Sequence, residues 1–239
     1  MKKIYFIRHG ETNYNKLKIS QGSEIDSILN ETGIFQSKLT GKYLNNFRQK
    51  NKPFDCIISS NLKRAYQTAN IIADEINYKD EIIKLDILNE IGWGKLSGLD
   101  KNDDLYKKTM NLYDKKLNNI KDPIKRYNFD IEKYLNKKLN LNIEENIQIN
   151  NRVIKVIDYI ENSNCNKIII VSHSSFILDI IKKLFNQTRI PIDNNSNCSI
   201  CYVIYKNNKY IMKSPINTEH LDIKYDWLIS KCFIKKYHI

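Results

Sequence analysis

The feature that most constrains this chain is a pair of short apolar runs, each of which ends in a histidine. Residues 4–7 (Ile-Tyr-Phe-Ile) lead directly into Arg8 and His9, and residues 168–172 (Ile-Ile-Ile-Val-Ser) lead into His173. Short, fully apolar runs are typical of strands buried inside a parallel sheet. Such sheets bind ligands beyond the carboxyl ends of their strands. We therefore expect both histidines to lie at one functional edge.

Strand and helix patterns alternate along most of the chain, which predicts a single domain (residues 1–239) with a three-layer α/β/α sandwich around a mostly parallel sheet. Residues 99–145 are rich in Lys, Asn, Asp and Tyr, with helical periodicity and no strand signal. We interpret this segment as a helical insertion, which is either a lid over the substrate or simple helix packing, and residues 222–239 as an extra C-terminal tail. The remaining expected elements are strands at 54–58, 82–85, 198–205 and 210–214, the last two of edge type, and helices from Thr32 and at 62–76, 146–160 and 175–185.

Two further side chains are expected at the same edge. Arg64 falls in the first turn of the helix predicted at 62–76, and Glu90 follows an apolar run close to Trp93. Histidine and arginine side chains together suit a tetrahedral oxyanion, because arginine offers bidentate donors and a histidine can accept a phosphoryl group. A carboxylic acid with a raised pKa can protonate the departing alkoxide.

Composition narrows the possible partners. The chain has 39 Lys+Arg against 27 Asp+Glu, a net charge of +12, but the basic residues are scattered, so we interpret them as a solvated surface and expect no nucleic-acid partner. No apolar run reaches the length of a membrane span, and the basic N-terminus does not resemble a signal peptide, so we expect a cytoplasmic protein without membrane contact. Cys198 and Cys201 have CxxC spacing, but on a strand they point to opposite faces, so we expect no metal site.

Several motifs match one known family in the correct order. The first is Arg8-His9-Gly10-Glu11-Thr12, and Val171-Ser172-His173 supplies a second histidine. The ordered set resembles the signature of the histidine phosphatase superfamily, the phosphoglycerate mutase-like proteins. The other matching segments are Leu29–Gly33, Ser59–Ala69, Leu88–Glu90 with Gly94 and Gly98, Glu145-Asn146 before Arg152-Val153, and Asn217–Leu221.

The resemblance implies a role for each core residue. His9 is the expected phosphorylated nucleophile, and Glu90 the proton donor and later the base that activates water. The phosphate clamp is expected to consist of Arg8, Arg64 and His173. Asn15, Gln21 and Gly22 are expected to line the phosphate or substrate side of the pocket. The resemblance also implies that no metal is needed, and we expect no cofactor.

The chain departs from the family pattern at a few positions. Ser174 and Ser175 stand where glycines are common, Ser97 where an acidic residue is common, and Ile28 where a proline is common. The loop of residues 21–26 is one residue longer than usual. These departures affect the shape of the substrate pocket and remove no catalytic group.

The sequence favours hydrolysis over isomerisation. The mutases carry an Arg-His-Tyr run after the acid, whereas Glu90 is followed by Ile91-Gly92-Trp93. We therefore expect a phosphomonoesterase that acts on a phosphorylated small molecule or phosphoprotein through a phosphohistidine on His9. Phosphoglycerate mutase-type phosphoryl transfer is one alternative, and a non-catalytic phospho-ligand binding or scaffold module is another. A homodimer through a short edge strand remains open.

Overall fold

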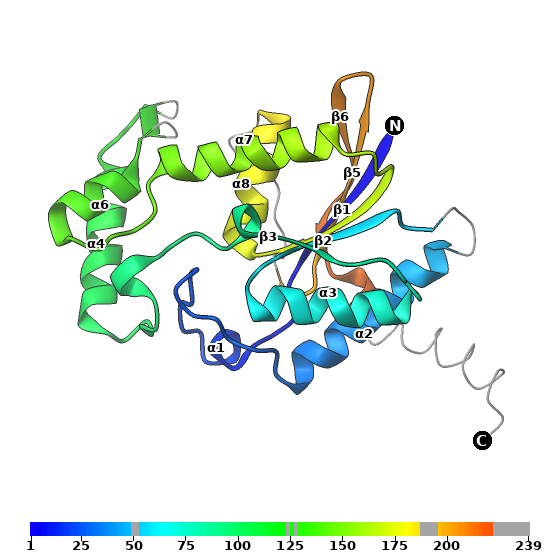
Figure 1. Cartoon of the computed structure of the whole chain (residues 1–239). Coiled ribbons are helices and arrows are strands. Elements are labelled where there is room, and N and C mark those ends of the chain that lie inside the picture. The colour runs from blue at the N-terminus through cyan, green and yellow to red at the C-terminus, as the bar shows by residue number, and fades with distance from the viewer. Residues whose placement is uncertain (49–52, 123–124, 127–128, 187–195, 222–239) are drawn as a thin grey trace.

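A computed structural model describes residues 1–48, 53–122, 125–126, 129–186 and 196–221 (Figure 1). The tail expected at 222–239 lies outside the described residues. Among the described residues, every helix is too short or too polar to cross a bilayer.

Six strands form one mixed sheet in the order β3-β2-β4-β1-β5-β6. Strands β1 to β4 run parallel, while β5 is antiparallel to β1 and β6 is antiparallel to β5. The expectation that both C-terminal strands lie at an edge is wrong for β5, because β5 pairs with β1 on one side and β6 on the other. The strands are β1 (Lys2–Arg8), β2 (Cys56–Ser60), β3 (Ile83–Leu85), β4 (Lys167–Ser172), β5 (Ile200–Lys206) and β6 (Lys209–Asn217).

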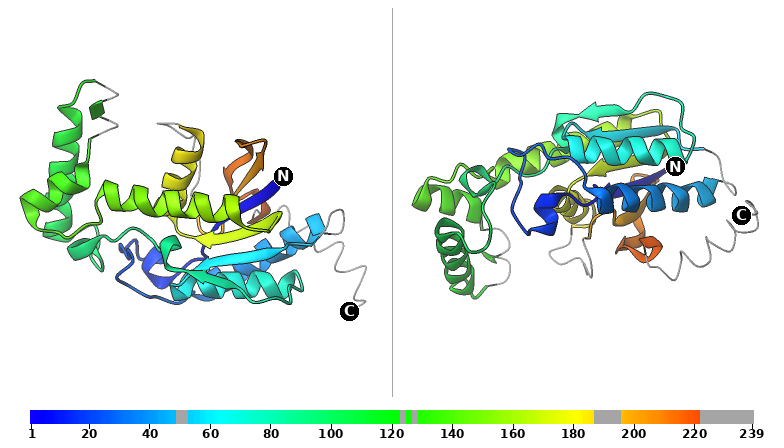
Figure 2. Two further views of the ribbon diagram at one scale, coloured as in Figure 1. Left: turned by 45° about the horizontal axis from the view of Figure 1, so that its top comes forward. Right: turned by 90° about the horizontal axis from the view of Figure 1, so that it is seen from below.

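Helices cover both faces of the sheet, which confirms the three-layer sandwich (Figures 1 and 2). Along β1, Ile4 and Phe6 pack in the core under α7 and α8, while Tyr5 and Ile7 pack in the core under α2 and α3. This alternation follows from the two-residue period of a strand with both faces buried. The covering helices are α2 (Glu31–Arg48), α3 (Lys63–Glu75), α7 (Asn146–Asn162) and α8 (Ser174–Phe185), and a short α1 (Asn13–Lys16) follows β1.

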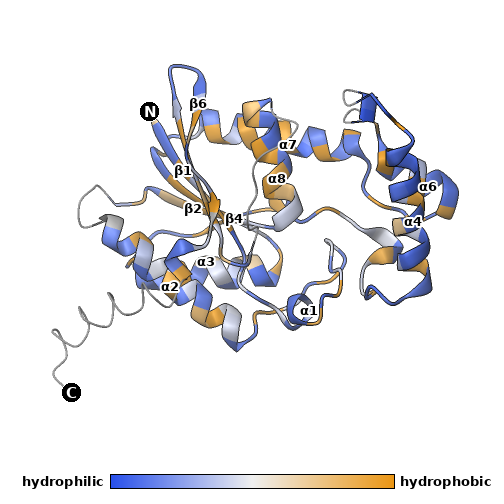
Figure 3. Cartoon of the chain, turned by 180° about the vertical axis from the view of Figure 1, so that it is seen from behind, coloured by the Kyte–Doolittle hydropathy of each residue, from blue (hydrophilic) through white to orange (hydrophobic). Residues whose placement is uncertain are grey.

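The predicted insertion is helical and contains α4 (Asp104–Asn118) and α6 (Ile131–Leu139). It projects beyond the edge at which the parallel strands end (Figures 1 and 2). Most of the residues in its helices are hydrophilic (Figure 3), and its buried side chains, including Leu135 and Leu141, form a separate small core. Trp93 packs against both this small core and the core under α7 and α8, so it joins the insertion to the sandwich.

The N-terminus of α2 fixes the backbone that follows β1. Asn30 Oδ1 accepts from the N–H of Gly33 at 2.9 Å, and the N–H of Asn30 donates to the carbonyl of Glu11 at 3.0 Å. Gly33 lies so close to Glu11 that a Cβ at this position would stand 2.6 Å from the Glu11 nitrogen and nearer still to its carbonyl oxygen. A glycine is required here because backbone, not a flexible side chain, fills the space.

We expect Gly33→Ala to destabilise the fold by about 3 kcal/mol, because the methyl group forces α2 away from the backbone of Glu11. The free energy of unfolding in urea measures this. Thr32→Ala, at the exposed neighbouring position, is the matched control and should stay within about 0.5 kcal/mol of wild type. Equal stabilities for the two variants would contradict the close approach.

Candidate active site

The two predicted histidines meet at the carboxyl edge of the sheet. Strands β1 and β4 are neighbours with Arg8 opposite Ser172, so the next residue on each strand is a histidine. The N–H of His9 donates to the carbonyl of Ser172 at 3.0 Å, and the rings of His9 and His173 have centroids 5.1 Å apart. Both rings are buried. Parallel pairing therefore produces the convergence that the two apolar runs predicted.

The hydrogen bond of His9 defines its tautomer. Its Nδ1 lies 2.7 Å from the carbonyl oxygen of Gly10, which only accepts, so Nδ1 carries the proton. Nε2 consequently holds the lone pair. Burial, followed by the charges of Arg64 and Arg8, lowers the pKa of His9 well below its usual value. The lowered pKa favours the neutral imidazole, with its lone pair on Nε2.

A short chain of hydrogen bonds holds the second histidine, His173. The hydroxyl of Ser60, at the end of β2, donates to Asn89 Oδ1 at 2.7 Å and lies 2.8 Å from Nε2 of His173. Because the Ser60 hydroxyl proton goes to Asn89, the Ser60 oxygen accepts a hydrogen bond from Nε2 of His173. Nδ1 of His173 is then a buried atom without a partner among the described residues. Burial lowers the pKa of His173 well below its usual value. Sequence reasoning missed Ser60; its place at the end of a parallel strand was the available signal.

Arg64 lies in the first turn of α3 and is almost fully buried. Its two terminal nitrogens donate to the carbonyls of Ile25 at 2.7 Å and Gly22 at 2.8 Å. Its buried Nε has no partner within the described part of the chain. Burial lowers the pKa of Arg64 to about 10, so the guanidinium remains charged at neutral pH. A buried cation with an open donor favours an anionic ligand.

Glu90 is a buried carboxyl group beside both arginines. Its Oε1 accepts from the N–H groups of Ile91 at 3.0 Å and Phe176 at 3.2 Å, whereas Oε2 has only a long contact of 3.4 Å with the N–H of Ser175. Burial raises the pKa of Glu90, although the Ile91 N–H and the charge of Arg64 oppose this. Because Oε1 already accepts two hydrogen bonds, the proton of a protonated Glu90 carboxyl group lies on Oε2.

Arg152 on α7 holds the segment that carries Glu90. Its guanidinium forms two bonds of 2.7 Å with the carboxylate of Glu144, and it donates to the carbonyl of Asn89 at 2.7 Å. It also lies 4.2 Å from the ring centre of Phe176. Sequence reasoning noted Arg152 only as part of a motif and assigned it no role, because its partners are distant in sequence.

The three residues predicted to line the substrate side also have contacts within the protein. Asn15 Oδ1 accepts from the N–H and hydroxyl of Thr12 in the cap of α1. Gln21 donates to the Thr12 hydroxyl at 3.0 Å and accepts from Ser27. The carbonyl of Gly22 accepts from Arg64. These contacts support the fold of the loop, and a role in substrate binding stays a prediction.

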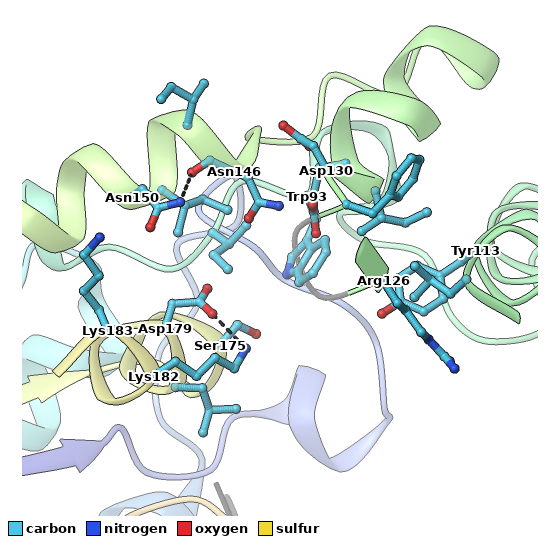
Figure 4. A pocket seen from close by; sticks show the side chains of 18 of the residues that line it. Trp93, Tyr113, Arg126, Asp130, Asn146, Asn150, Ser175, Asp179, Lys182 and Lys183 are labelled. Atoms are coloured by element: carbon cyan, nitrogen blue, oxygen red, sulfur yellow. Dashed lines mark hydrogen bonds and ion pairs between the residues drawn. The ribbon is translucent and has the colours of Figure 1, made fainter. Parts of the chain in front are cut away.

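A cavity of about 1160 Å³ lies between the insertion, α7 and α8. Its lining includes Ile91 and Ser175, whose N–H groups contact the Glu90 carboxylate, but none of the five predicted core residues. Figure 4 shows Ser175, Asp179 and Lys182 of α8 facing Trp93 and the insertion across it, with Asp179 and Lys182 in an ion pair of 2.9 Å. The lining mixes basic with acidic side chains: Lys121, Arg126, Lys182 and Lys183 against Asp130, Glu132 and Asp179.

The sheet and its edge define an α/β protein in which His9, His173 and Arg64 are buried together at the carboxyl ends of the parallel strands. A model of the histidine phosphatase superfamily (branch 1) matches residues 4–218. The chain therefore belongs to the histidine phosphatase superfamily.

Curated relatives match only part of the chain. A phosphoglycerate mutase of Schizosaccharomyces pombe is 40% identical over 101 residues, which cover 42% of this chain and 46% of that protein. Fructose-2,6-bisphosphatase TIGAR B of Danio rerio is 40% identical over 97 residues, which cover 40% of this chain and 36% of that protein. Each match thus spans less than half of the relative.

Solved structures match the fold over nearly the whole chain. Phosphoglycerate mutase from Bacillus anthracis superposes with a TM-score of 0.70 at 22% identity, covering 89% of this chain and 92% of that one. A phosphoserine phosphatase mutant from Entamoeba histolytica has a TM-score of 0.63 at 24% identity and covers 93% of this chain and 100% of that one. At these identities the likeness concerns the fold.

Proposed function

We propose that the chain is a phosphomonoesterase that hydrolyses its substrate through a phosphohistidine on His9. The observation that carries this proposal is the pairing of a neutral imidazole, whose Nε2 lone pair is free of the Gly10 bond, with the buried Nε–H of Arg64, which has no partner among the described residues. A phosphate dianion supplies the negative charge that balances the positive charges of Arg8 and Arg64. Its binding also raises the pKa of His173, whose Nδ1 then donates to a phosphate oxygen.

The first step forms a bond between His9 Nε2 and phosphorus while the ester P–O bond breaks. The electron pair of that bond goes to the leaving oxygen, which takes the proton of Glu90 from Oε2. In the second step the Glu90 carboxylate accepts a proton from water as the water oxygen attacks phosphorus. The N–P bond then breaks, and inorganic phosphate and neutral His9 are restored. Arg8, Arg64 and His173 stabilise the charge on the equatorial oxygens throughout.

We place the alcohol portion of the substrate on the Glu90 side, in the cavity that Ile91, Trp93 and Ser175 line. Hydrolysis is favoured over a mutase reaction by the run that follows the acid, which is Ile91-Gly92-Trp93 and not Arg-His-Tyr. The lining carries Lys121, Arg126 and Lys183 besides the Lys182–Asp179 ion pair and the carboxylates of Asp130 and Glu132, so it can also hold an anionic group of the substrate.

Turnover of an aryl phosphate in the presence of EDTA tests the proposal, with release of inorganic phosphate as the measurement. A parallel assay supplies 3-phosphoglycerate with bisphosphoglycerate and follows isomerisation. We expect phosphate release without isomerisation. Isomerisation without net phosphate release supports the mutase alternative, and tight phosphate binding without either reaction supports a non-catalytic module.

The pH profile should reflect the buried state of both catalytic groups. The active form has His9 neutral and Glu90 protonated. Because the pKa of His9 is lowered, activity should persist at about pH 5, where an ordinary histidine is mostly protonated. Because the pKa of Glu90 is raised, the acid should keep its proton above the usual carboxyl range and lose it as the pH rises further. The measurement is kcat/KM against pH; an acid limb near the ordinary pKa of histidine would contradict this assignment.

A further inference from the structure

A carboxylate outside the predicted site joins the two loops that form its walls. Glu24 lies in the lengthened loop of residues 21–26. Its Oε1 accepts from the N–H of Gly94 at 2.8 Å, and its Oε2 accepts from the N–H of Trp93 at 3.2 Å and the hydroxyl of Ser97 at 2.7 Å. Three donors from one short segment therefore converge on this single side chain.

Two glycines make room for the Glu24 carboxylate. Gly22 has a φ of +60°, and a Cβ there would collide with Oε2 of Glu24. A Cβ at Gly92 would stand 3.1 Å from Oε1. Glu24 is exposed to solvent, but its carboxylate lies between the backbones of the two loops, so its position depends on both.

One of these loops contacts the proposed phosphate clamp, and the other follows the proposed proton donor, Glu90. The loop of residues 21–26 holds the guanidinium of Arg64 through the carbonyls of Gly22 and Ile25. The segment bonded by the Glu24 side chain begins three residues after Glu90. Glu24 is therefore a direct mechanical link between the phosphate clamp and the proton donor.

The other side of the Glu90 segment is fixed independently. The carboxylate of Glu144 accepts from the N–H of Gly92 at 3.1 Å, and the N–H of Glu144 donates to the carbonyl of Gly92 at 2.8 Å. Glu144 in turn is held by Arg152. Beyond the segment, Gly98 and Leu99 bond to the backbone of Ser20. Loss of Glu24 would therefore keep both ends of the segment attached and allow the residues between them, with the neighbouring Glu90, to shift relative to Arg64.

We propose that Glu24 is a positioning residue that sets the distance between Glu90 and the phosphate bound by Arg64. This inference rests on the proposed function, since it assigns Glu24 to the proton transfer of that reaction. A general acid must come within hydrogen-bonding reach of the leaving oxygen, and a displacement of about 1 Å can cost about 100-fold in rate. Glu24 acts through Glu90 and does not touch the substrate.

The test compares Glu24→Ala with wild type on two esters. On an alkyl phosphate, whose leaving group needs the proton, we expect kcat to fall about tenfold. On p-nitrophenyl phosphate, whose leaving group needs little help, we expect a loss of less than about threefold. Glu24→Gln should recover part of the alkyl rate, because its amide oxygen still accepts. Glu31→Ala, an exposed glutamate in the first turn of α2, is the matched control and should behave as wild type on both esters.

Two further measurements separate positioning from general damage. In a Glu90→Gln background, Glu24→Ala should cause no additional loss specific to the alkyl ester. Amide hydrogen exchange of residues 92–98 should become faster in Glu24→Ala and remain unchanged in Glu31→Ala. Equal losses on both esters, unchanged rates, or an alkyl-specific loss that persists without Glu90 would each overturn the proposal. If wild type hydrolyses neither ester, the proposed function fails, while the exchange measurement still decides whether Glu24 holds this segment.

Discussion

Replacing His9 with alanine is expected to lower kcat on an aryl phosphate by about 10⁴-fold or more, because the bond-forming atom of the reaction is lost. Nε2 of His9 holds the free lone pair, and Nδ1 is fixed by the carbonyl of Gly10. The neighbouring ring of His173 cannot replace it, since its Nε2 is bonded to Ser60 and its Nδ1, protonated once phosphate is bound, is a donor without a lone pair. Binding should persist, because the arginines of the clamp remain, so the loss should appear in kcat more than in KM.

A buried histidine elsewhere in the fold provides the control for this substitution. His220 is buried and its Nε2 lies 3.0 Å from the hydroxyl of Thr40, on the α2 side of the molecule. His220→Gln should therefore alter stability without a comparable loss of rate. Mass spectrometry of enzyme denatured during turnover should find one phosphoryl group on wild type and none on His9→Ala. Activity of the alanine variant above about a tenth of wild type would remove His9 as the nucleophile.

The sequence predicted the positions of those candidate site residues that follow directly from the order of strands and helices along the chain. The runs before His9 and His173 need only parallel pairing of β1 and β4 to bring the two rings together. Arg64 needs only a helix that begins after β2. These placements depend on local pattern and on the general rule for parallel sheets, so a single sequence is sufficient to derive them.

Other parts of the site depend on contacts that no local pattern contains. The bond between Ser60 and His173 joins residues 113 positions apart, and the bond between Glu24 and Trp93 joins residues 69 positions apart. Glu24 is visible in the sequence, but the direction of its carboxylate is set by loop geometry. The misassigned edge strand has the same cause, because the residues of β5 do not reveal that β6 continues the sheet.

Replacing Glu90 with glutamine should produce the second large effect, and one that depends on the substrate. We expect kcat on an alkyl phosphate to fall by about 10³-fold, because the leaving alkoxide loses its proton donor. On p-nitrophenyl phosphate the loss should be about tenfold, since nitrophenolate departs without a proton and only the base role in the second step is affected. The carboxyl group of glutamate and the amide group of glutamine are isosteric, so the substitution removes the acid and preserves the shape of the side chain.

The contacts of Glu90 allow glutamine to replace it with little change to the surrounding structure. The amide oxygen can keep the bonds that Oε1 accepts from the N–H groups of Ile91 and Phe176, and only the 3.4 Å contact with Ser175 is lost. The N-terminus of α8 should therefore remain in place, and the thermal unfolding midpoint should stay close to that of wild type. The basic limb of the pH profile should also disappear, because it reports loss of the Glu90 proton. Equal losses on the two esters, or a retained basic limb, would assign the proton transfer to another group.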